Sequence, residues 1–236
     1  MSGALKRAVV PALVLAGGVI ARGRLAIPAL LAWAALASLG FCVAAEAARD
    51  RAQSDPRRDL RIYSGFVFGT AMAMLVSGTA VLMGILAFAA AVSLAKLDPG
   101  RLATQCVIAI LLGFPLMYGA IAVDLPLQGA LPWTLAAWLA LVLQLMSRLE
   151  HGAGESSSSR LSVGTALLSI ALVPASLIWP AHASYHGAYF LIVLFAELCL
   201  LAAATRLLVG RTDRVSLLVE GAMVVGLIAL VAGRVG

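Results

Sequence analysis

Two glutamates lie inside long apolar stretches, where a charged side chain is costly. Glu197 lies in the middle of the stretch 189–208, and Glu220 lies near the start of the stretch 215–232. A charge at the centre of a bilayer costs roughly 2.5–3.5 kcal/mol on insertion scales. Both carboxylates are therefore candidates for a proton or ion site in a transport pathway. The alternatives are a protonated carboxyl group bonded to a neighbouring helix for Glu197, and an ion pair with a nearby arginine for Glu220.

Two histidines form a weaker candidate site. His182 and His186 are four residues apart beside three aromatic residues. This spacing places two imidazoles on one face of a helix, as in paired metal ligands. The segment begins with Pro180, however, so a turn with interfacial aromatic residues is the favoured interpretation.

Other chemical signatures are missing from the sequence. The three cysteines are far apart, which excludes a C-x-x-C pair. No metalloprotease, serine-hydrolase or phosphate-loop motif occurs. We therefore expect no catalytic residue, no cofactor and no bound metal.

The composition is that of a membrane protein. Of the 236 residues, 62% are hydrophobic and 12% are charged, whereas about a quarter of the residues in a soluble domain are charged. The sequence predicts an all-α, polytopic transmembrane helical bundle with about seven to nine spans. The net charge of +6 comes from loops beside apolar stretches, which favours anionic lipid head groups as partners and argues against nucleic acid.

Apolar stretches alternate with short polar loops along the whole chain. The predicted spans are 27–48, 102–123, 132–146, 161–179, 189–208 and 215–232, with a longer apolar run at 62–95. Basic residues concentrate in the loops 49–61, 96–101 and 148–160 and around 206–214. The positive-inside rule places these arginine-rich loops in the cytoplasm. We expect a bacterial plasma membrane protein, with the loops 124–131 and 180–186 outside.

The number of spans depends on two segments. The run 62–95 is either one long helix or a hairpin that turns near Ser77 and Gly78. Both flanking loops are basic, so they should lie on the same side, which favours the hairpin. The stretch 8–21 is a span, an interfacial helix or a signal peptide, and a retained helix is preferred because polytopic membrane proteins usually need no cleaved signal.

Three segments organise the predicted bundle. Residues 1–150 form an N-terminal bundle, 151–160 a serine-rich cytoplasmic linker, and 161–236 a C-terminal three-helix bundle. Gly65 and Gly69 lie on one helix face and permit close helix approach. They could therefore bind another membrane protein or a second copy of the chain.

Three functions compete on these observations. The first is a small-solute, proton or ion transporter with Glu197, and with Glu220 as a second candidate, in its pathway. The second is a non-catalytic subunit that anchors or assembles a larger membrane complex. An intramembrane enzyme acting on a lipid or quinone ranks third, because no catalytic pair is visible, and the sequence leans against an enzyme.

Overall fold

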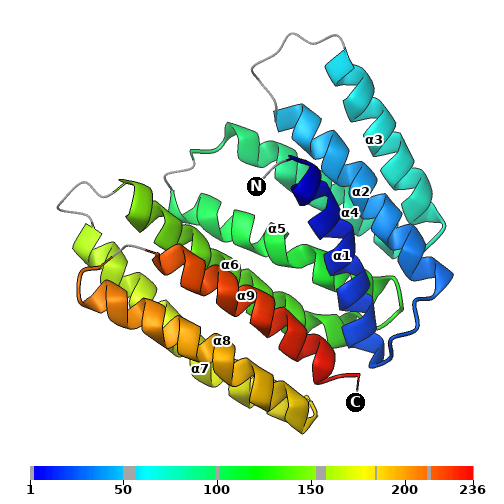
Figure 1. Ribbon diagram of the computed structural model, residues 1–236. Coiled ribbons are helices and arrows are strands. Elements are labelled where there is room, and N and C mark those ends of the chain that lie inside the picture. Colours follow the sequence, from blue (N-terminus) through cyan, green and yellow to red (C-terminus); the bar gives the residue numbers. More distant parts are fainter. Residues whose placement is uncertain are drawn as a thin grey trace. The chain divides into compact units, whose positions relative to one another are not determined.

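The computed structural model describes residues 3–49, 57–98, 101–152, 158–183, 185–211 and 214–235. These residues form nine α-helices and one short 3-10 helix, η1 (Figure 1). The elements are α1 (Gly3–Arg22), α2 (Ala29–Arg49), α3 (Arg57–Met74), α4 (Gly78–Ser93), η1 (Leu94–Lys96), α5 (Leu102–Ile121), α6 (Pro126–Gly152), α7 (Ser158–His182), α8 (Gly187–Leu208) and α9 (Val215–Ala232). The predicted all-α bundle is confirmed. By length and apolar composition, six helices can cross a membrane: α2 and α5 to α9.

The chain divides into two compact units. Unit 1 is Met1–Trp133 and unit 2 is Thr134–Gly236. The division falls within α6, so this helix begins in unit 1 and continues in unit 2. Residues 153–157 of the predicted linker 151–160 lie outside the described residues.

The apolar run 62–95 is a hairpin, as the charge of its flanking loops predicts. Helices α3 and α4 are joined by a turn at 75–77 and pack against each other. The Ser77 hydroxyl accepts a hydrogen bond from the Ala80 backbone N–H at 3.1 Å and so caps the start of α4. Because α3 and α4 are antiparallel, the start of α3 and the end of α4 lie at the same end of unit 1.

Helices in unit 1 approach each other at glycines. A Cβ on Gly40 of α2 would lie 2.7 Å from the Gly69 nitrogen and 2.8 Å from the Gly65 carbonyl oxygen, both on α3. The close approach predicted from Gly65 and Gly69 is therefore made to α2 of the same chain. Binding of another protein or of a second copy stays a prediction.

Helix α1 also approaches its neighbour α5 at glycines. In α1, a Cβ on Gly17 would collide with the backbone of Leu116 on α5, and a Cβ on Gly119 of α5 would collide with the Val14 carbonyl of α1. Val14 and Ile20 are fully buried. The predicted stretch 8–21 thus lies within α1, which is an integral part of unit 1.

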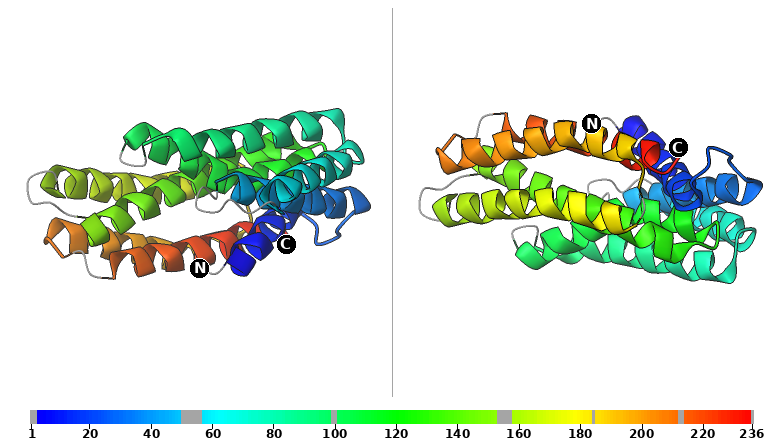
Figure 2. Two further views of the ribbon diagram at one scale, coloured as in Figure 1. Left: turned by 90° about the horizontal axis from the view of Figure 1, so that it is seen from above. Right: turned by 90° about the horizontal axis from the view of Figure 1, so that it is seen from below.

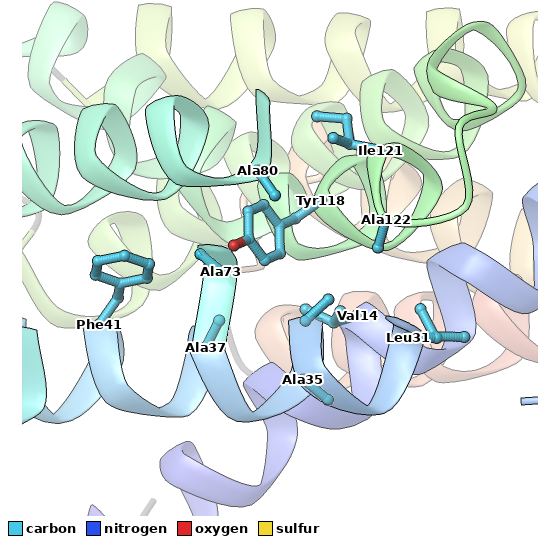
Figure 3. Packing of buried hydrophobic residues seen from close by; sticks show 11 residues of the cluster. Val14, Leu31, Ala35, Ala37, Phe41, Ala73, Ala80, Tyr118, Ile121 and Ala122 are labelled. Atoms are coloured by element: carbon cyan, nitrogen blue, oxygen red, sulfur yellow. The ribbon is translucent and has the colours of Figure 1, made fainter. Parts of the chain in front are cut away.

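The core of unit 1 is almost wholly apolar. Figure 3 shows its residues converging from α1, α2, α3, α4 and α5, with the Tyr118 ring reaching toward Ala73 and Ala80. The Tyr118 hydroxyl is buried and has no hydrogen-bond partner among the described residues. Helices α2 and α3 also share an edge-on pair of rings, Phe41 and Phe66, with centroids 6.0 Å apart. Close packing joins these helices along their length, and hydrogen bonds from Arg58 add to it at the start of α3.

Two helix boundaries differ from the predicted spans. Helix α6 begins at Pro126 and not at Pro132, because proline is tolerated in the first turn of a helix. Helix α7 continues through Pro174 and Pro180 to His182. The loop predicted at 124–131 and the turn predicted at 180–186 are therefore shorter than the sequence suggested.

Candidate functional site

Glu197 makes a polar contact with a serine of the preceding helix. It lies on α8 with 5% of its surface exposed, and its Oε1 lies 2.8 Å from the Ser176 Oγ on α7. The Ser176 Oγ also lies 2.7 Å from the Val173 carbonyl oxygen, one turn earlier on α7. Helices α7 and α8 run antiparallel (Figure 2), and this contact joins the last third of α7 to the middle of α8.

A tyrosine completes the contact by binding the backbone of Ser176. Pro180 has no N–H, so the Ser176 carbonyl, four residues earlier, lacks its helical donor. The Tyr189 hydroxyl donates to this carbonyl at 2.6 Å, and Tyr189 is 1% exposed. A side chain of α8 thus replaces the missing hydrogen bond of α7. We call Ser176, Tyr189 and Glu197 the Ser176 cluster.

Further hydroxyl groups line the same helix. Ser162 of α7 donates to the Leu207 carbonyl of α8 at 3.0 Å, near the opposite end of the pair. Thr165 and Ser169 bond to carbonyls of their own helix, at 2.7 Å and 2.8 Å. The α7–α8 pair is therefore joined by side-chain hydrogen bonds at two levels.

The other candidate residues lie elsewhere. Glu220, on the second turn of α9, is exposed, unlike the buried Glu197. His182 is the last residue of α7, and His186 is the N-cap of α8. The two histidines therefore do not lie on one continuous helix, and metal binding by them stays a prediction. Among the described residues, no group of three or more His, Cys, Asp or Glu side chains could hold a metal ion.

The turn after α7 is closed by the end of the chain. The His186 N–H donates to the Gly233 carbonyl at 2.9 Å. The Arg234 guanidinium lies 5.4 Å from the centre of the Tyr185 ring and donates to the Ala183 carbonyl at 3.4 Å. Burial raises the pKa of Tyr185 to about 12, although the charge of Arg234 lowers it. We call this contact of Arg234 with Tyr185 and Ala183 the latch of unit 2.

One end of unit 1 carries a concentration of cations, which we call the basic end. It consists of Arg57, Arg58, Arg61, Lys96 and Arg101, at the start of α3, the end of η1 and the start of α5. All but Arg58 are exposed. Arg58 instead donates from Nε to the Ala47 carbonyl and from Nη2 to the Ala48 carbonyl, both at 3.0 Å. It thus ties the start of α3 to the end of α2.

Sequence reasoning missed the partners of Glu197 and the role of Arg58. The sequence does contain a signal for the Ser176 contacts. Pro180 lies four residues after Ser176 and has no N–H, so the Ser176 carbonyl needs a donor from outside the helix. No local pattern, however, specifies which residue of α8 faces it.

Comparison with known proteins gives a match in fold and none in sequence. No protein-family model and no curated protein sequence matches the chain. A structure from work on digeranylgeranylglyceryl phosphate synthase in membranes matches with a TM-score of 0.81 and 11% identity, over 96% of this chain and 93% of that one. The apo structure of a UbiA homolog from Aeropyrum pernix K1 matches with a TM-score of 0.68 and 16% identity, over 93% and 95%.

These matches overturn the first-ranked function. The fold is that of membrane proteins of which one is a lipid synthase, so the transporter hypothesis is wrong. At this identity the likeness shows the fold alone: the chain is an integral membrane protein whose helical bundle is similar to those of digeranylgeranylglyceryl phosphate synthase and a UbiA homolog.

Proposed function

We propose that the protein is an intramembrane enzyme that transfers a prenyl group from an isoprenoid lipid to an acceptor. The observation that carries this proposal is the match in fold over nearly the whole of both chains with digeranylgeranylglyceryl phosphate synthase. The product named there joins geranylgeranyl chains to a glyceryl phosphate. An enzyme for such a reaction must hold an apolar chain in the bilayer and a charged group at its surface.

The chemistry of prenyl transfer calls for cations at the membrane surface. The bond between the prenyl carbon and the oxygen of its leaving group breaks, and the electron pair stays with that oxygen. A new bond forms to the acceptor, which gives its proton to water or a base. Cations beside a phosphate-type leaving group stabilise its growing negative charge.

The basic end of unit 1 supplies such cations. Arg57 and Arg61 lie in the first turns of α3, where the partial positive charge of the helix start adds to theirs. Lys96 and Arg101 flank the adjacent loop. We assign the charged head of the substrate to this end and its apolar chain to the membrane-facing surface. Arg58 holds the framework through its bonds to α2.

The orientation in the membrane follows from the same charges. We place the arginine-rich loops in the cytoplasm, in a bacterial plasma membrane, because positive loops are retained on that side. Anionic lipid head groups would then also gather at the basic end.

The proposal is tested with the full-length protein in lipid nanodiscs. Geranylgeranyl diphosphate serves as donor and a glyceryl phosphate lipid or a total lipid extract as acceptor, and products are identified by mass. We expect a prenylated product, and a rate at least about tenfold lower for the double variant Arg57→Gln, Arg61→Gln. Arg24→Gln, an exposed arginine at the other end of unit 1, is the matched control and should keep the rate. Absence of prenylated product with every acceptor would refute the function, and an undiminished rate in the double variant would refute the site.

A further inference from the structure

The Ser176 hydroxyl has more short contacts than one proton can serve if Glu197 is ionised. A serine hydroxyl donates one hydrogen bond and accepts up to two. Its oxygen lies 2.7 Å from the Val173 carbonyl oxygen and 2.8 Å from the Glu197 carboxyl oxygen. A carbonyl oxygen only accepts, so the contact with Val173 uses the serine proton. The contact with Glu197 then needs a proton from the glutamate.

The alternative arrangement leaves two oxygens in contact without a proton. If Glu197 were a carboxylate, Ser176 would donate to it, and the serine oxygen would face the Val173 carbonyl at 2.7 Å with no hydrogen between them. Two acceptor atoms at this distance repel each other. Only the neutral acid turns both contacts into hydrogen bonds.

In the part of the chain that the structure describes, no other group supplies the missing proton or the balancing charge. The Tyr189 hydroxyl is the neighbouring acid, and its single proton is committed to the Ser176 carbonyl at 2.6 Å. Within the described residues, Glu197 forms no ion pair. A carboxylate that is 5% exposed in a membrane span, with neither a cation nor a second donor, would be strongly unfavourable.

We propose that Glu197 is a neutral carboxylic acid whose proton is donated to Ser176, while Ser176 donates to Val173. This assigns to Glu197 the task of joining α8 to α7 through a chain of two hydrogen bonds. The assignment is independent of prenyl transfer and holds whether or not the protein is an enzyme. It makes this acid a structural donor in the membrane and not a site for a cation.

Infrared spectroscopy of the full-length protein at neutral pH tests the assignment. A detergent without ester or carboxyl groups is used, because the ester carbonyls of phospholipids absorb in the same region as a neutral acid. A neutral carboxylic acid has a carbonyl stretching band that an ionised carboxylate lacks. We expect this band in the wild-type protein, its loss in Glu197→Gln, and its retention in Glu220→Gln, the exposed glutamate of α9. Absence of the band from the wild type, or its persistence in Glu197→Gln, would overturn the proposal.

A second variant tests the hydrogen bond itself and does not require Glu197→Gln to fold. Ser176→Ala removes the acceptor, so the acid carbonyl band should shift to higher frequency, as expected when an acid loses a hydrogen bond. Thr165→Val removes a hydroxyl of the same helix that bonds to the Leu161 carbonyl and not to Glu197. This variant should leave the band in place. An unshifted band in Ser176→Ala would show that Ser176 does not accept the proton.

Discussion

The two units of the protein join their helices in different ways. In unit 1, glycines such as Gly40 and Gly119 bring backbones into direct contact. In unit 2, helices α7 and α8 are joined by polar side chains, of which the Ser176 cluster is the main example. Helix association in a bilayer can use close packing or interhelical hydrogen bonds. In the contacts described here, close packing predominates in unit 1, where Arg58 adds hydrogen bonds to α2, and side-chain hydrogen bonds join α7 to α8 in unit 2.

The glycines themselves show the difference. Inside helices α7 and α9 of unit 2, a Cβ added to Gly164 or Gly221 would meet nothing within 4 Å, whereas Gly233, beyond the end of α9, is tightly packed against Tyr189. The buried tyrosine hydroxyls of the two units also differ. The Tyr118 hydroxyl in unit 1 has no hydrogen-bond partner among the described residues, whereas the Tyr189 hydroxyl in unit 2 has one. Unit 1 should therefore be sensitive to added volume, and unit 2 to the loss of polar atoms.

The largest effect is expected where a methyl group would enter the α1–α5 contact. Gly119→Ala places a Cβ against the Val14 carbonyl, and a backbone cannot swing aside as a side chain can. We expect a loss of about 3 kcal/mol or more in the free energy of unfolding, or failure to fold. Thermal unfolding in detergent measures it.

The matched control for that substitution is Gly221→Ala on α9, where the space is open. Alanine is the better helix former, so stability should rise by about 0.5–1 kcal/mol. Equal losses in the two variants would remove the contrast between the units.

The next effect concerns the bond that Pro180 makes necessary. Tyr189→Phe leaves the Ser176 carbonyl without a donor, and we expect a loss of about 1–2 kcal/mol, measured by the same unfolding assay. Combining it with Pro180→Ala should recover part of this loss, because the new N–H can reach the same carbonyl. If the two changes in unfolding free energy were simply additive, the new N–H at position 180 would not replace the Tyr189 hydroxyl as the donor to the Ser176 carbonyl.

A smaller effect is expected at the latch of unit 2. Arg234→Gln removes the cation over the Tyr185 ring and should cost about 0.5–1 kcal/mol. Because the arginine charge lowers the pKa of Tyr185 from what burial alone would give, the pKa of Tyr185 should be higher in the variant than in the wild-type protein. Tyrosinate absorbance, with Tyr185→Phe subtracted, measures this shift; a downward shift would contradict it.

The sign of the associated stability change follows from the direction of that shift. The folded-state pKa of Tyr185 lies above the ordinary tyrosine value of 10.0, so the folded protein holds the proton more tightly. The stability from the buried neutral phenol is full below about pH 10 and declines as the pH rises through about 12. Tyr185→Phe should lack this decline.

The smallest effect is expected for Tyr118→Phe in unit 1. The hydroxyl is buried without a partner among the described residues, so removing it should change stability by less than about 0.5 kcal/mol or increase it. The unfolding assay used for Tyr189→Phe gives the direct comparison. A loss as large as in that variant would mean that the Tyr118 hydroxyl has a polar partner, and would remove the contrast with Tyr189.

Much of the fold follows from simple sequence properties. The basic loops on either side of 62–95 predict its hairpin correctly, because an even number of crossings must separate two loops on one side. The predicted start of α6 is too late, because the segment 124–131, which is predicted to be an outside loop, already contains the start of the helix at Pro126. Apolar length and charge determine the spans, but local backbone choices determine their ends.

The candidate site could be predicted only in part. The depth of Glu197 marks it as a residue that needs an explanation, but its contact with Ser176 depends on the register of α8 against α7, which no local pattern contains. An acid in a span was interpreted as part of a pathway, although one serine is enough to accommodate it. The likeness in fold could not be inferred either, because at 11% identity almost no side chain is shared with the synthase.

Pro180 also constrains the order in which the chain can enter the membrane. As α7 leaves the ribosome, the Ser176 carbonyl has no donor until Tyr189 emerges and α8 folds back. A lone α7 in the lipid phase would therefore contain an unpaired backbone group, which hydrocarbon does not tolerate. Helices α7 and α8 should thus pass from the insertion machinery into the bilayer together, as a preformed pair.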